Sequence, residues 1–116
     1  MKAYTDMEQS KELSEILLPE SADMCYYYKD NKPQLTPYSE HNNRYYIPCW
    51  SLSTLLGFLD RTAYFIDEDA SVSLSSYKTI KWTVGIDNSD LELITEADPV
   101  DACVKMILKL HELNLL

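Results

Sequence analysis

The chain has 116 residues, of which 46% are hydrophobic and 25% charged, a composition typical of one globular domain over residues 1–116. Ten basic residues against nineteen acidic ones give a net charge of −9, which disfavours direct nucleic-acid binding and docking on anionic membrane surfaces. Two glycines in the whole chain exclude a glycine-rich phosphate-binding loop.

The first predicted element is a helix that begins near Thr5 and ends at Pro19. Residues 5–8 match a capping box, in which Thr5 is the N-cap and the Glu8 carboxylate reaches back to its backbone N–H. The apolar stripe of this helix consists of Leu13, Ile16 and Leu17.

Two tyrosine-rich stretches favour β-strands, because aromatic residues are enriched there. We expect residues 21–29 to form an edge strand, and residues 44–47 to be extended because a proline follows them. The intervening residues 30–43 contain Pro33 and Pro37 and show no periodicity, so we interpret them as a loop.

A second helix should begin after Ser51, its expected N-cap. Its apolar residues hold the i, i+3, i+4, i+7 spacing of one helical face, and they are Leu52, Leu55, Leu56 and Leu59. Gly57 lies on the opposite side and weakens the helix by about 1 kcal/mol relative to alanine. Such a glycine suggests the close approach of another backbone.

After this helix and up to residue 96, the hydrophobic period changes to two, which predicts strands joined by short turns. The expected elements are a short strand over residues 62–66, a turn at 67–69, the longest strand over 77–86, a hairpin turn at 87–90 and a last strand at 91–95. In the longest strand, Ile80 is expected on the same face as Trp82, Val84 and Ile86. Such an antiparallel meander has one solvated face and one face covered by helices.

The best-signalled helix comes last, over residues 98–116. Asp98 is placed to be the N-cap, and Pro99 at the first helical position loses no hydrogen bond. The broad apolar face consists of Val100, Cys103, Val104, Ile107, Leu108, Leu110 and His111, so most of the circumference should be buried. The predicted fold is α+β: an antiparallel sheet of three to five strands with three helices, the C-terminal helix packed across one sheet face.

Three stretches carry a family resemblance: residues 21–26 (SADMCY), residues 47–52 (IPCWSL), and residues 98–103 (DPVDAC) together with 109–113 (KLHEL). In this order they resemble a family of small, acidic, uncharacterised proteins of gut Bacteroidales, often encoded on prophages or other mobile elements. The resemblance covers most of the chain. It implies a bacterial cytoplasm and an accessory role, and it transfers no site residues.

The cysteine and histidine side chains are Cys25, Cys49, Cys103, His41 and His111. Zinc ligands normally include pairs two to four residues apart, and none exists here, so we predict no metal and no cofactor. An odd number of cysteines, no CxxC pair and no apolar signal segment predict free thiols in the cytoplasm. Cys49 precedes a helix, where a thiol pKa falls, but its proline and tryptophan neighbours favour burial.

Nine tyrosines against two phenylalanines are the most unusual feature of the composition. The two clusters are Tyr26, Tyr27, Tyr28 and Tyr45, Tyr46. They must point to both faces of any strand that they occupy, so part of each lies outside the core. Either they form an interaction surface, as tyrosines often do, or they line a thin core with their hydroxyls at its rim.

We therefore predict a non-enzymatic accessory protein of a phage or mobile element that acts through contacts with an unknown protein partner, with these five tyrosines as the candidate interaction surface. We also expect weak homodimerisation through an exposed strand edge at residues 26–28, strengthened by salt and weakened by Tyr27→Glu. The alternative is an acidic inhibitor or nucleic-acid mimic that binds a basic protein, which an acidic ridge would favour. A small Cys/His hydrolase or redox enzyme is third, and a deep pocket containing Cys49 or His111 would favour it.

Overall fold

The structure, a computed structural model, describes residues 1–39, 46–78 and 80–116. Within these residues it has three α-helices, one 3₁₀ helix and six strands. Their bounds are α1 (Met7–Ser14), the 3₁₀ helix η1 (Pro19–Ser21), β1 (Met24–Lys29), β2 (Lys32–Pro37), β3 (Ile47–Cys49), α2 (Leu52–Ile66), β4 (Ser71–Tyr77), β5 (Lys81–Asp87), β6 (Ile94–Glu96) and α3 (Pro99–Glu112).

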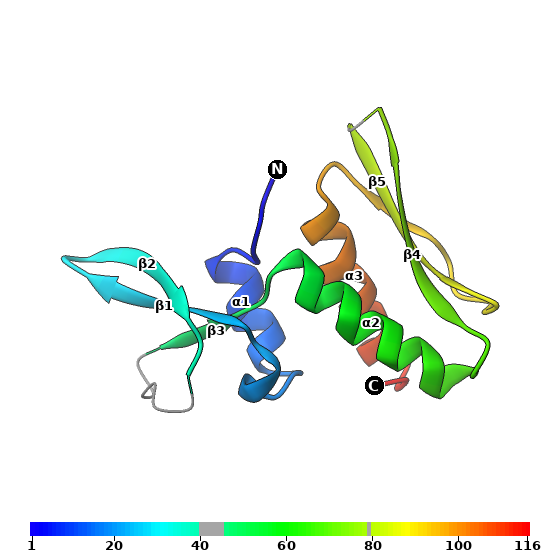
Figure 1. Cartoon of the computed structure of the whole chain (residues 1–116), viewed down its shortest axis with the longest axis horizontal. Helices are drawn as coiled ribbons and strands as arrows, with labels where there is room; N and C mark the ends of the chain where they lie inside the picture. Colours follow the sequence, from blue (N-terminus) through cyan, green and yellow to red (C-terminus); the bar gives the residue numbers. More distant parts are fainter. Residues whose placement is uncertain (40–45, 79) are drawn as a thin grey trace.

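The strands form two antiparallel sheets of three strands each among the described residues, with the orders β2-β1-β3 and β4-β5-β6. The α+β class, the antiparallel pairing and the three helices of the prediction are confirmed. Figure 1 shows the two sheets at opposite ends of the molecule, with the helices between them. The β1–β2 hairpin extends away from the helices at one end (Figure 1).

The first helix, α1, is capped one residue later than predicted. The Asp6 carboxylate accepts from the Gln9 N–H at 2.8 Å, and the Gln9 side chain accepts from the Asp6 N–H at 3.0 Å. Thr5 is instead buried, with its hydroxyl 2.8 Å from that of Ser10. The predicted box of Thr5 and Glu8 is therefore wrong, because the Thr5 hydroxyl accepts from the backbone N–H of Trp50 at 3.1 Å.

The first sheet corrects two predictions about residues 21–43. β1 is the central strand of the sheet and not an edge strand. Asp30 and Asn31 have φ values of 53° and 62°, and they form a two-residue hairpin turn that leads into β2. The predicted loop is thus wrong for residues 32–37, where the prolines fit an edge strand, which tolerates a missing N–H. The rest of the predicted loop and extended segment, at residues 40–45, lies outside the described part of the chain.

The second helix, α2, begins as predicted but continues further. Ser51 is the N-cap, and its hydroxyl accepts from the Thr54 N–H at 3.3 Å. The strand predicted over residues 62–66 is wrong, because these residues are the last part of α2. Fully buried Ala63 extends the face of Leu59, so core packing overrides the strand preference of the flanking residues.

Gly57 does not mark a close backbone contact. A Cβ atom added to this glycine would lie 3.6 Å from the Arg61 guanidinium, on its own helix, and would touch no other backbone. The expected approach of another backbone is therefore wrong, and the glycine only lowers the helix propensity of α2.

The strands of the second sheet have other bounds than predicted. Residues 77–86, expected to be one strand, contain the turn between β4 and β5, where the Ile80 N–H donates to the Tyr77 carbonyl at 3.0 Å. Ile80 is accordingly 60% exposed and does not share the buried face of Val84 and Ile86. The tight turn predicted at 87–90 is the start of a longer connection, since β6 begins only at residue 94.

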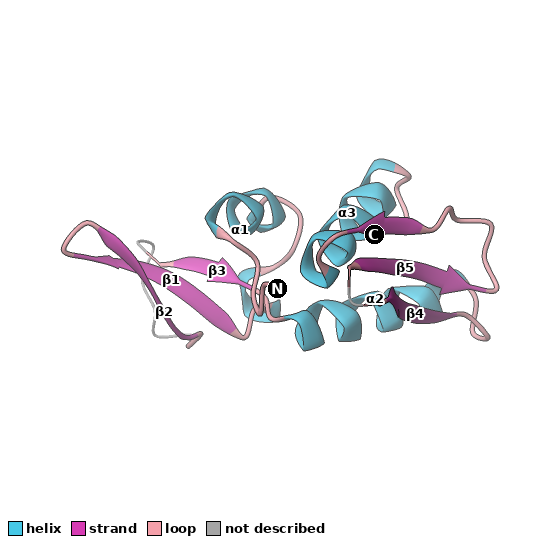
Figure 2. Cartoon of the chain, turned by 90° about the horizontal axis from the view of Figure 1, so that it is seen from above, coloured by secondary structure: helices cyan, strands magenta, loops and turns pink. Residues whose placement is uncertain are grey.

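The C-terminal helix, α3, matches the prediction most closely, although it ends at Glu112 and not at residue 116. The Asp98 carboxylate accepts from the Val100 N–H at 2.9 Å, and Pro99 occupies the first helical position. The helix packs across β5 and β6, while α2 covers the same face at β4 (Figure 2). Cys103 is fully buried, whereas His111 is exposed, because burial along the chain ends at Leu110. The predicted place of His111 on the buried face is therefore wrong.

Candidate functional site

The predicted tyrosine surface is divided between the two faces of the first sheet. Side chains alternate along β1, so Tyr26 and Tyr28 face one way and Tyr27 the other. The Tyr26 hydroxyl donates to the Thr5 carbonyl at 2.7 Å, and burial, followed by the nearby Cys49 and Asp6, raises the pKa of this phenol. Tyr26 thus ties the sheet to the start of α1.

On the opposite face, Tyr27 stacks on Tyr46, with ring centroids 5.6 Å apart and planes inclined by 20°. Both residues are half-buried. Tyr28, beyond Tyr26 on the first face, is 56% exposed near the hairpin end. Tyr45 lies outside the described residues. The sheet therefore brings together one tyrosine pair and leaves the other two on its other face.

The three thiols are all fully buried. Burial, with a smaller contribution from Asp98, raises the pKa of Cys103 to about 12. Burial also raises the pKa of Cys49 to about 12, aided by Asp23 and Cys25. Because the thiolate is the reactive form of cysteine, both side chains are held in the unreactive state.

Cys25 and Cys49 are neighbours in the first sheet but point to opposite faces. Cys49 is paired with Met24 across the strands, so it shares the face of Met24, while Cys25 lies on the other face. The register therefore does not favour a disulfide between them.

The histidine and cysteine side chains do not form a metal site in the part of the chain that the structure describes. Among the described residues, no group of three or more His, Cys, Asp or Glu side chains is arranged to hold a metal ion. His41 lies outside these residues, and His111 is exposed. Over the same part of the chain, no helix is long and apolar enough to cross a membrane.

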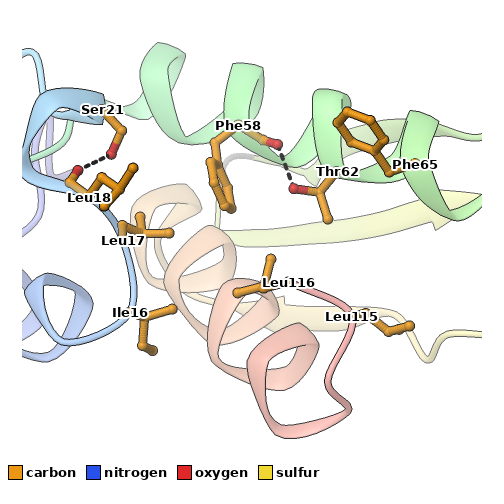
Figure 3. Close-up of a pocket in the computed structure, with 9 residues that line it drawn as sticks. All are labelled: Ile16, Leu17, Leu18, Ser21, Phe58, Thr62, Phe65, Leu115 and Leu116. Atoms are coloured by element: carbon orange, nitrogen blue, oxygen red, sulfur yellow. Dashed lines mark hydrogen bonds between the residues drawn. The ribbon is translucent and has the colours of Figure 1, made fainter.

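An apolar groove that the sequence did not reveal lies between α2, the segment that follows α1, and the C-terminal tail (Figure 3). Its volume is about 400 Å³. The residues that line it are Ile16, Leu17, Leu18, Ser21, Phe58, Thr62, Phe65, Leu115 and Leu116. Phe58, Thr62 and Phe65 follow one another at i, i+4 and i+7 and so form one wall from a single helical face.

The two hydroxyls in the groove already have partners. The Thr62 hydroxyl donates to the Phe58 carbonyl at 2.9 Å. The Ser21 hydroxyl donates to the Leu18 carbonyl at 2.7 Å and accepts from the Trp50 indole N–H at 3.0 Å. The other lining side chains are all hydrocarbon. The groove therefore offers apolar area and shape, and none of its lining side chains carries a charge.

The rim of the groove is well exposed to solvent. Phe65 is 85% exposed and Leu18 is 74% exposed, although both are large apolar side chains. A contiguous apolar patch of this kind on a protein surface marks a binding site more often than scattered single residues do. The strand predicted over residues 62–66 hides the position of Phe65 on the same helical face as Phe58 and Thr62.

A second, polar cavity of about 320 Å³ lies between α1 and α3. The Lys2 ammonium bridges the carboxylates of Asp6, at 2.9 Å, and Asp101, at 2.7 Å. Hydrogen bonds to Asp101 and then Asp6 raise the pKa of Lys2 well above its ordinary range. Nearby, Lys105 is paired with Glu96. The Lys2 bridge to Asp101 thus holds the N-terminal segment against α3.

Comparisons of the chain with protein-family models, with curated proteins and with solved structures found no match. The function is therefore inferred from the surfaces and side chains described above.

Proposed function

We propose that this chain is a non-enzymatic accessory protein that binds an amphipathic helix of a partner protein in its apolar groove. The observation that carries the proposal is the apolar lining of the groove together with its exposed rim at Leu18 and Phe65. An amphipathic helix that lays its apolar face into a hydrophobic groove is a recurring mode of protein recognition.

The shape of the groove favours a helix over a flat protein surface. One wall is the face of α2 from Phe58 to Phe65, a rise of roughly 10 Å at 1.5 Å per residue. That length accommodates about two turns of a second helix, which would present apolar residues at i, i+3 or i+4, and i+7. Leu18 and Leu115 would then contact the sides of the bound helix.

Charge favours a partner helix whose polar side is basic. The chain has a net charge of −9, and exposed Glu15 and Glu20 are the sequence neighbours of the lining residues Ile16 and Ser21. Lysine or arginine on the solvent side of the partner helix would be attracted during approach, which raises association rates more than final affinity. With the resemblance described above, the partner would be a bacterial or phage protein in the cytoplasm.

The alternatives have less support from the described side chains. Neither Cys49 nor His111 lines either of the two cavities, and Cys49 is buried with a raised pKa, so a Cys/His enzyme is not favoured. A nucleic-acid mimic needs unpaired carboxylates, and Asp6 and Asp101 are less available for this role because Lys2 bridges them. A protein-binding role therefore remains the best supported reading.

A designed pair of model helices tests this proposal. The first peptide carries leucine on one face and lysine on the other, and the second has the same composition in scrambled order without an apolar face. We expect the amphipathic peptide to bind at least about tenfold more tightly, since a buried leucine side chain contributes about 1.5–3 kcal/mol. Isothermal titration gives the affinities, and amide shifts in the NMR spectrum locate the peptide.

Two variants on adjacent residues of α2 provide the matched control. Phe65→Glu places a charge on the rim and should weaken binding about tenfold or more, whereas Tyr64→Glu adds the same charge at an exposed position outside the groove lining. Equal affinity of the two peptides, or equal effects of the two variants, would rule out the groove as the binding site.

A further inference from the structure

The outer strand of the second sheet, β4, has an edge without the usual protection against pairing. Its seven residues, SVSLSSY, contain no proline and no charged side chain. Edge strands normally carry such residues, because unpaired backbone groups invite another strand. β2, the edge strand of the first sheet, has them in Lys32, Pro33 and Pro37. Figure 1 shows that the β4–β5 hairpin projects past the helices, so this edge is accessible near its tip.

The backbone groups that face outward along β4 can be assigned from one contact. The Val72 N–H donates to the Asp60 carboxylate of α2 at 3.2 Å, so it points away from β5. Inward and outward directions alternate in an antiparallel pair. Leu74 and Ser76 therefore also direct their N–H and C=O groups outward. Asp60 occupies one outward donor at the start of β4, and the outward groups at Leu74 and Ser76 form the free edge.

We propose that two copies of this chain pair antiparallel along β4, about a two-fold axis at Ser75. In this register Leu74 of each copy lies opposite Ser76 of the second copy, and their outward groups exchange four backbone hydrogen bonds across the axis. The Val72 contact to Asp60 is retained. The β4-β5-β6 sheets of the two copies then form one continuous sheet, with the two β4 strands side by side at its centre.

A local contact between opposite charges favours a second copy as the occupant of this edge. The register places Lys78, in the turn after β4, opposite Val72 of the second copy and hence beside its Asp60. The two-fold axis repeats this contact, so each end of the interface gains one oppositely charged pair. Turn residue Ile80, 60% exposed, lies at the same ends. Repulsion between two chains of charge −9 remains, so the dimer strengthens as salt screens it.

This dimer is distinct from the one expected from the tyrosine segment. That expectation placed an edge at residues 26–28, where β2 pairs with all three residues and β3 pairs with Tyr26. The β4 interface contains no residue that lines the apolar groove, so it is independent of the proposed helix binding. Tyr27→Glu, which should weaken a dimer formed through β1, is accordingly a control that leaves the β4 dimer unchanged.

Cysteine cross-linking tests the register directly. Ser75 of the two copies face each other in a non-hydrogen-bonded pair, with Cβ atoms about 4.5–5.5 Å apart, close enough for a disulfide after a small adjustment. Ser75→Cys should therefore form a covalent dimer on mild oxidation. Ser73→Cys, on the same strand and face, lies opposite Tyr77 of the second copy and should not. The native cysteines are fully buried and do not compete.

Sedimentation measured across concentration and salt tests the association itself. Ser76→Pro removes an outward N–H and leaves the bonds to β5, so it should raise the dimer Kd about thirtyfold for two lost hydrogen bonds, while its circular dichroism stays native. In the unaltered protein, the amides of Leu74 and Ser76 should gain protection from hydrogen exchange as concentration rises, and those of Ser73 and Ser75 should not change.

A monomer at every concentration and salt level would overturn the proposal. Equal cross-linking of Ser75→Cys and Ser73→Cys would also overturn it. A dimer that dissociates on Tyr27→Glu but persists in Ser76→Pro would do the same.

Discussion

Replacing Ile107 with alanine should lower the free energy of unfolding by about 2.5–4 kcal/mol. Ile107 is fully buried in α3, in the core cluster that also contains Leu59 and Val84. Removing the side chain beyond Cβ forfeits about 0.8 kcal/mol per buried carbon, or roughly 2.4 kcal/mol in transfer free energy. The cavity left behind adds to this loss, and the better helix propensity of alanine returns a few tenths of a kcal/mol.

Urea unfolding followed by circular dichroism and tryptophan fluorescence measures this change, because Trp50 is fully buried and reports on the core. Leu113→Ala, at the exposed end of the same helix, is the matched control and should change stability by less than about 0.5–1 kcal/mol. A loss below about 1 kcal/mol for Ile107→Ala, at an unchanged m-value, would refute the central packing of α3.

Three further predictions follow from local contacts. The pKa of Asp6 lies below its ordinary value, since hydrogen bonds from Gln9 and Lys2 outweigh the opposing effect of burial. Asp6→Asn should therefore destabilise the protein near pH 7, and its difference from the native chain should shrink as pH falls below about 4, measured by urea unfolding at each pH. Cys103 should resist mild alkylation in the native state, as mass spectrometry would measure, and rapid labelling of this thiol would contradict its burial. Asn31→Ala should destabilise by about 1 kcal/mol because its φ of 62° is unfavourable for alanine, while Asn31→Gly should be tolerated, as thermal unfolding would show.

The elements that sequence reasoning located correctly are those whose signals are local. Ser51 and the Asp98–Pro99 pair each cap their own helix through hydrogen bonds to residues that follow within one turn. The burial of Cys103 followed from helical spacing alone, because a side chain on a broad apolar face must be covered. Such contacts need no knowledge of the rest of the chain.

The errors occurred where a distant residue decides the outcome. Thr5 has the right neighbours for an N-cap, but its buried hydroxyl accepts from the backbone N–H of Trp50 at 3.1 Å. Residues 62–66 have strand-like composition, yet the face they continue is packed against the core, so they stay helical. Serine-rich β4 has only two aliphatic residues, Val72 and Leu74, and its pairing with β5 fixes it as a strand.

The candidate sites belong to the same second class. The groove is assembled from residues 16–21, α2 and the tail at 115–116, and the chain order of these segments does not indicate that they meet. The free edge of β4 and the central position of β1 likewise depend on which strands pair. Length and net charge follow directly from the sequence. The helix caps at Ser51 and Asp98 and the helical spacing of apolar residues are also determined by the sequence, because they involve residues within one or two turns of each other. Strand partners, exposed edges and cavities were decided only by the tertiary structure, because they depend on burial and hydrogen bonding between segments far apart in the chain.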